Sequence, residues 1–287
     1  MGLLFLNRII KIILINLKRK LKIFEQNIEM NNQEVLFRKM NKNSHNKVTK
    51  NTININCNQY NEYPNIERIK TIKTITEYTD CLLSLFLLKD RRIAACSEYN
   101  TINIYNPING YYCEEIINRH NQGINSICEL EDGTIVSCSN DKSIIIGDFT
   151  INNAHNDRIN KVITLPNNRI ASCSWDKTIK IWKSDKPYSY VPIKVLEGHS
   201  NYVTSLLYIK ERDIMISGSN NGTLRLWNMA TYQSDKIING VYCCNTNAIY
   251  QIDNDRVIVG HKNGFYIVNI DKCVKVQEVL DKSLGFV

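Results

Sequence analysis

The chain has 287 residues, of which 43% are hydrophobic and 22% charged, so its composition is globular and excludes a wholly disordered protein. Its formal net charge of +8 is confined to residues 1–50, which hold 11 basic and 3 acidic side chains, whereas residues 51–287 hold 25 of each. Because a neutral body lacks the basic surface that nucleic-acid phosphates require, we expect no sequence-specific nucleic acid among its partners.

A basic extension, predicted to be helical and then irregular, occupies residues 1–65. Within residues 1–24, basic side chains gather on one side of a helical projection and Leu and Ile on the other, which is typical of a helix on an anionic membrane surface. The uncharged run of residues 12–17 is too short to cross a bilayer. The pattern leaves open a translation start at Met30, a helix without a targeting role and an organelle presequence.

From about residue 80 the chain repeats one pattern five times. Each copy predicts a half-buried strand, a polar turn, a strand of small residues, a tight turn, an alternating strand and a looser fourth strand. The predicted first strands are Leu82–Leu87, Ile124–Leu130, Ile159–Leu165, Val203–Ile209 and Thr246–Ile252. Counted from Ser97 through Ser139, Ser174 and Ser219 to His261, the copies are 42, 35, 45 and 42 residues apart, a spacing typical of four-stranded propeller blades.

The third copy has His155 before its first strand, Ser172 in the second strand, Asp176 in the tight turn and Trp182 at the end of the third strand. In these residues the chain resembles the WD40 repeat family, over residues 66–287. The resemblance implies an all-β propeller of four-stranded blades, each locked by a hydrogen-bonded chain through such a quartet. Other copies carry parts of the set: His199, Ser217 and Trp227 with Asn221 in place of Asp, and His120, Ser137 and Asp141 with Gly147 in place of Trp.

About five blades are recognisable, fewer than the rings of this family usually contain. The ring is therefore incomplete, or it pairs with another chain, or it closes with five blades or a partial sixth. The sixth would draw on residues 51–56, 69–75 and 284–287.

No nucleotide-binding, hydrolase or metalloprotease motif occurs, so we expect no catalysis, no cofactor and no metal site. Three of the five His residues occupy the same repeat position, which indicates a structural role. Three Cys residues, Cys96, Cys138 and Cys173, also share one position, which favours buried, reduced thiols. Reduced thiols are typical of a cytoplasmic protein, with the nucleus as an alternative.

Trp175 breaks the repeat, because it stands in a turn position that is polar in every other copy. The resemblance places that turn on one rim of the ring, together with a loop position that holds Arg158 and Tyr202 in adjacent copies. These three residues would form an aromatic and cationic patch for a partner. The alternative is that Trp175 only packs against a neighbouring loop.

We therefore predict a non-catalytic scaffold or adaptor that presents this rim to a protein or peptide partner. The sequence leaves three other roles open: the substrate-recognition subunit of a ubiquitin ligase, a membrane-surface adaptor recruited by residues 1–24, and a truncated repeat fragment without function.

Overall fold

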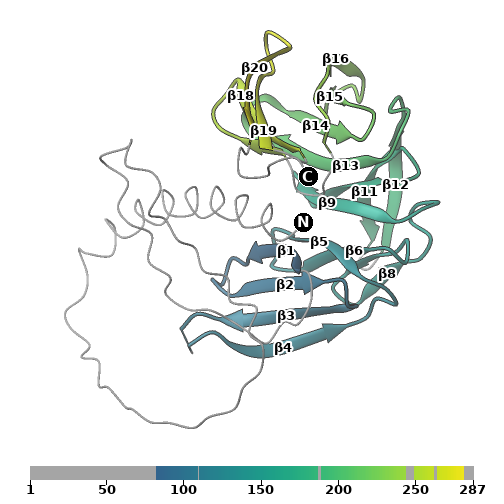
Figure 1. The fold of residues 1–287 in the computed structure, drawn as a ribbon. Helices are drawn as coiled ribbons and strands as arrows, with labels where there is room; N and C mark the ends of the chain where they lie inside the picture. The colour runs from purple at the N-terminus through teal and green to yellow at the C-terminus, as the bar shows by residue number, and fades with distance from the viewer. Residues whose placement is uncertain (1–81, 109, 187–188, 244–248, 262–263, 281–287) are drawn as a thin grey trace, which may run out of the picture. The chain divides into compact units, whose positions relative to one another are not determined.

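The computed structural model describes residues 82–280 apart from 109, 187–188, 244–248 and 262–263 (Figure 1). The predicted basic extension over residues 1–65 lies outside the described residues, as do the segments 51–56, 69–75 and 284–287 that would build a sixth blade. The described part is all-β, with one short 3-10 helix (Lys210–Arg212). No helix within it is long and apolar enough to cross a membrane.

The strands form five antiparallel sheets of four, each in chain order, which confirms the five predicted blades. The first two sheets contain β1 (Leu82–Leu87), β2 (Ile93–Ser97), β3 (Thr101–Asn106) and β4 (Tyr112–Asn118), then β5 (Ile124–Glu129), β6 (Ile135–Ser139), β7 (Ile144–Ile146) and β8 (Phe149–Ile151). The third contains β9 (Ile159–Leu165), β10 (Arg169–Ser174), β11 (Ile179–Lys186) and β12 (Ser189–Leu196). The last two contain β13 (Val203–Ile209), β14 (Ile214–Ser219), β15 (Thr223–Asn228) and β16 (Ser234–Asn239), then β17 (Ile249–Gln251), β18 (Arg256–His261), β19 (Gly264–Asn269) and β20 (Val274–Leu280).

The length of each copy follows from its outer strands. In the second sheet β7 and β8 have three residues each and are joined by a tight turn in which Gly147 adopts a φ of +54°. In the third sheet β11 and β12 have eight residues each. The second sheet therefore accounts for the short spacing of 35 residues between Ser139 and Ser174.

Apolar clusters join successive sheets, which follow one another in chain order in Figure 1. The second strand of each sheet is covered on both faces, and β10, for example, is buried at every position except Arg169. Small residues suit these positions where side chains of the neighbouring sheet approach closely. Gly218 of β14 is one such position, since a Cβ on it would lie 2.7 Å from Sγ of Cys243.

The first sheet lacks a covering that the next three sheets have. Leu85 of β1 pairs with β2 as Ile127, Val162 and Leu206 pair with the second strands of their own sheets. Those three side chains are 3%, 0% and 3% exposed because the preceding sheet packs on them, whereas Leu85 is 47% exposed. The described part of the chain holds no sheet before β1.

Candidate functional site

Two loop positions meet at one rim of the sheets, as the Trp175 and Arg158 pair shows. The backbone N–H of Trp175, which follows β10, donates to the carbonyl of Arg158, which precedes β9, at 3.0 Å. The hydroxyl of Ser174 donates to the same loop, 3.0 Å from the carbonyl oxygen of Asp157 and 2.9 Å from that of Arg158. The N–H of Asp176 in turn donates to Ser174 Oγ at 3.0 Å. The repeated serine thus ties the turn after β10 to the loop before β9.

The structure brings Arg158, Trp175 and Tyr202 together in one stack, which we call the rim cluster. The rings of Trp175 and Tyr202 are stacked, with centroids 4.2 Å apart and an interplanar angle of 10°. Cζ of Arg158 lies 4.0 Å from the centroid of the Trp175 ring. Two groups this close cannot share one face of an indole, so Trp175 is the middle layer. Arg158 precedes β9 of the third sheet, the sheet that also carries Trp175, whereas Tyr202 precedes β13 of the fourth sheet.

The burial of the rim cluster follows from the stack. Trp175 is half-buried rather than exposed because both faces of its ring are covered, and Tyr202 is also half-buried. Arg158 is the exposed member. A partner would therefore meet the guanidinium, the edge of the indole and the outer side of the phenol. The structure thus brings the three predicted residues together, and the binding of a partner by them stays a prediction.

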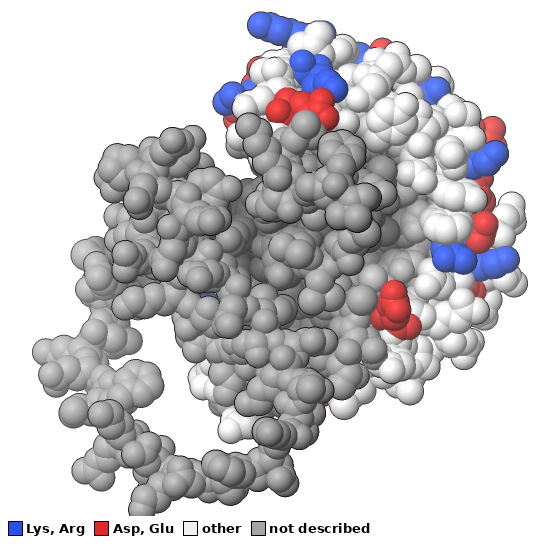
Figure 2. Space-filling view, in the orientation of Figure 1, with Lys and Arg blue, Asp and Glu red and all other residues white. Residues whose placement is uncertain are grey.

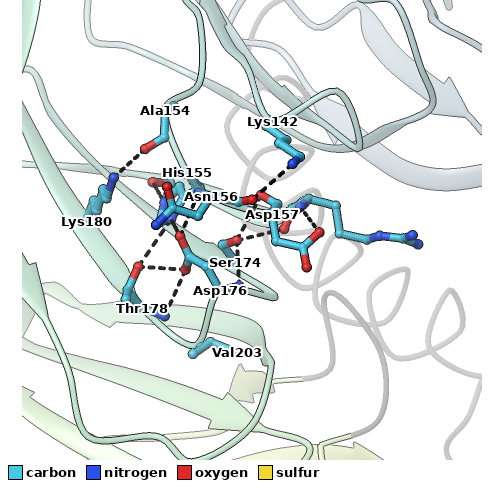
Figure 3. A network of polar contacts seen from close by, with 12 residues as sticks. Lys142, Ala154, His155, Asn156, Asp157, Ser174, Asp176, Thr178, Lys180 and Val203 are labelled. Carbon is cyan, nitrogen blue, oxygen red and sulfur yellow. Dashed lines mark hydrogen bonds and ion pairs between the residues drawn. The ribbon is translucent and has the colours of Figure 1, made fainter.

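A series of buried hydrogen bonds runs through the third sheet, and Figure 3 shows its end at His155, Asp176 and Thr178. The indole N–H of Trp182 donates to Ser172 Oγ at 2.8 Å, and Ser172 Oγ lies 2.8 Å from Nε2 of His155. Nδ1 of His155 lies 2.8 Å from Oδ2 of Asp176. A carboxylate only accepts, so Nδ1 carries the proton and Nε2 accepts from the Ser172 hydroxyl. Each buried polar side chain of this hydrogen-bonded series, from Trp182 to Asp176, therefore has a partner.

The charge states of this series agree with those roles. Burial lowers the pKa of His155 more than the neighbouring Asp176 raises it, so the imidazole is neutral at neutral pH. Burial also acts to raise the pKa of Asp176, but hydrogen bonds from His155, Thr178 and the N–H of Asn156 outweigh it and hold that pKa below its usual range. Asp176 is therefore an ionised acceptor whose oxygens are already bonded within the sheet.

We call this hydrogen-bonded series of Trp, Ser, His and turn residue a lock. The fourth sheet contains the same lock without a carboxylate. Ser217 Oγ accepts from Trp227 at 2.8 Å and lies 2.7 Å from Nε2 of His199. Nδ1 of His199 lies 3.2 Å from Oγ1 of Thr223, whose hydroxyl donates to Oδ1 of Asn221 at 2.7 Å. A threonine thus relays the contact to the amide that replaces Asp.

The second sheet keeps the carboxylate but has no indole. His120 lies 3.1 Å from Asp141 through Nδ1 and 2.9 Å from Ser137 through Nε2. Ser143 donates to Asp141 at 2.6 Å. Where the other two locks have Trp, the turn residue Gly147 stands. The hydroxyl of Ser137 is therefore hydrogen-bonded to one ring, that of His120, whereas the hydroxyl of Ser172 is hydrogen-bonded to two.

One member of each lock was not predicted from the sequence. It is the hydroxyl group two residues after the Asp or Asn of the tight turn. It belongs to Thr178, Thr223 and Ser143, and each donates to the residue two positions before it. The signal was present as Asp-Lys-Thr, Asn-Gly-Thr and Asp-Lys-Ser. Such a spacing is that of a side chain that closes a local turn on Asp or Asn.

Within the described residues no group of three or more His, Cys, Asp or Glu side chains is placed to hold a metal ion. The described cysteines are free thiols. Burial raises the pKa of Cys96 to about 12, so this thiol is protonated and unreactive at neutral pH.

Comparison with known proteins gives matches in the region of the best copies. The family model for the WD domain, G-beta repeat, matches residues 111–148, 149–183 and 190–228. The chain is 30% identical over 98 residues to the probable coatomer subunit beta' of Schizosaccharomyces pombe, which covers 33% of this chain and 11% of that protein. It is 37% identical over 61 residues to the nuclear distribution protein nudF of Aspergillus niger, which covers 21% of this chain. The chain matches only 13% of the length of nudF.

Proposed function

The chain is a WD40 repeat protein, and we propose that it is a non-catalytic scaffold that presents the rim cluster to a protein or peptide partner. Domains of this family typically act as protein-interaction scaffolds and are usually not enzymes. The observation that carries the proposal is the stack of Arg158, Trp175 and Tyr202 across two adjacent sheets. Trp, Tyr and Arg are the residues most enriched at the energetic centres of protein interfaces.

The rim cluster is also held in place before any partner arrives. The backbone N–H of Trp175 donates a hydrogen bond to the carbonyl of Arg158. The next residue, Asp176, is hydrogen-bonded to His155 of the buried lock. Ordering side chains costs free energy on binding, so a preformed cluster retains more of its contact energy as affinity.

The experiment selects random linear peptides from a display library on the purified full chain. Binding of the selected peptides is then measured on wild type, Trp175→Ala and Asn220→Ala. Asn220 holds the corresponding turn position of the fourth sheet and is exposed, so it is the matched control. We expect Trp175→Ala to weaken binding at least tenfold and Asn220→Ala to leave it within about twofold.

Thermal unfolding of each variant shows whether the fold survives the substitution. Failure to select any binding peptide, or equal binding by both folded variants, would contradict the proposed role of the rim.

A further inference from the structure

We propose that the rim cluster recognises a carboxylate, supplied by an Asp or Glu side chain of the partner segment, and that Arg158 is the residue that binds it; this role presupposes the scaffold function proposed above. The argument depends on three features of the cluster: its unused hydrogen-bond donors, the charges around it and the shape of the guanidinium.

The side chains of the rim cluster offer mainly hydrogen-bond donors, and their one acceptor is the hydroxyl oxygen of Tyr202. The polar groups of the cluster are the guanidinium of Arg158, the indole N–H of Trp175 and the hydroxyl of Tyr202, of which the first two only donate. Across the part of the chain that the structure describes, none of the three donates a side-chain hydrogen bond. A ligand that fits these groups must therefore bring oxygen acceptors.

The described acidic side chains beside the rim cluster form no ion pair with Arg158. The carboxylate of Asp176 is hydrogen-bonded to His155 and Thr178 instead. Asp157 accepts the backbone N–H of Arg158 at 2.8 Å, and no bond joins its carboxylate to the guanidinium. Lys177, in the same turn as Trp175, is exposed and has no described acidic partner. Asp157 and Asp176 keep their negative charges, so the charges around the cluster are mixed, but the guanidinium of Arg158 has no carboxylate bonded to it among the described residues. The face drawn in Figure 2 likewise carries both signs among uncharged residues.

The planar shape of the guanidinium decides which ligand Arg158 can bind. Its Cζ lies 4.0 Å from the centroid of the Trp175 ring, and its N–H donors lie along the edge of a flat group. Such an edge matches the two coplanar oxygens of one carboxylate in a bidentate pair. The geometry therefore favours a single carboxylate.

The test uses the peptides selected on the wild-type chain. In the tightest binder each Asp is changed to Asn and each Glu to Gln, and Kd is measured by fluorescence anisotropy on wild type, Arg158→Gln, Arg158→Lys and Lys177→Gln. Lys177→Gln is the matched control, because it removes the same charge from a neighbouring residue outside the stack.

We expect the selected peptides to be enriched in Asp or Glu. One acid-to-amide change should weaken binding about tenfold on wild type and on Lys177→Gln, but at most about twofold on Arg158→Gln. Arg158→Lys should show an intermediate effect, since it keeps the charge and loses the planar fork.

The two proposals fail in different ways. Peptides that depend on Trp175 but carry no acidic preference, or that lose the same affinity on wild type and Arg158→Gln, overturn carboxylate recognition and leave the scaffold role standing. Peptides whose binding ignores Trp175→Ala, or the absence of any binder, overturn the scaffold role and carboxylate recognition with it.

Discussion

Replacing Ser172 by alanine should destabilise the protein more than replacing Ser137, although both serines occupy the same position of their sheets. Ser172 Oγ is bonded to the indole of Trp182 and to the imidazole of His155, each at 2.8 Å. Ser137 Oγ is bonded at 2.9 Å to the imidazole of His120 and has no indole partner. Both serines are buried, with 0% and 2% exposure, so water cannot replace the lost hydroxyl.

The magnitude follows from the groups left without a partner. A buried polar group that loses its hydrogen bond costs about 1–3 kcal/mol. Ser172→Ala orphans two such groups, and we expect a loss of about 2–6 kcal/mol in the free energy of unfolding. Ser137→Ala orphans one, with an expected loss of about 1–3 kcal/mol. Equilibrium unfolding in urea measures both.

A second substitution separates hydrogen bonding from packing. Trp182→Phe removes the indole N–H, so in the Ser172→Ala background it relieves one orphaned donor. The double variant should therefore lose less than the sum of the two single variants. The reasoning would be refuted by a Ser137→Ala loss equal to that of Ser172→Ala, or by strictly additive losses in the Ser172 and Trp182 pair.

Two further predictions concern pH and close packing. Burial, and then the charge of Arg225, lower the pKa of His199 from 6.5 to about 4, so below pH 6.5 the unfolded chain binds a proton that the native chain does not. We expect this residue to lose about 3 kcal/mol of stability as the pH falls from 6.5 to 4, and unfolding curves of His199→Asn should lack that loss. Gly218→Ala should cost about 1–3 kcal/mol in urea unfolding, because its Cβ would meet Cys243; with Cys243→Gly added, a loss as large as the sum of the single losses would contradict this contact.

The strands could be predicted because the repeat and the alternation of apolar residues act over short stretches. The bounds of β1, β9 and β13 coincide with the prediction, and β5 ends one residue earlier, at Glu129. Of the predicted strand Thr246–Ile252, the structure shows β17 at Ile249–Gln251 and does not describe residues 244–248. Local pattern was sufficient here because each sheet is built from consecutive hairpins.

Contacts between sheets could not be predicted in the same way. The stacking of Tyr202 on Trp175 depends on how the fourth sheet packs against the third, which no pattern within one copy specifies. The same holds for Cys243. Gly218 occupies in the fourth sheet the strand position that Cys173 occupies in the third, and the side chain of Cys243 fills the space beside Gly218. Such exchanges between sheets leave no regular spacing in the sequence.

The lock and the rim cluster share one turn of the chain, which explains why the break in the repeat stands where it does. Asp176 directly follows Trp175, and its carboxylate accepts from His155 while its N–H is held by Ser174. Buried hydrogen bonds thus fix the backbone that carries the rim cluster, and the Trp175 side chain makes none of the hydrogen bonds of the lock. Because the backbone and Asp176 make the hydrogen bonds of this turn, we expect the residue at position 175 to be replaceable without loss of the fold. The hydrogen bonds of this turn thus involve the backbones of Trp175 and Arg158 and not their side chains.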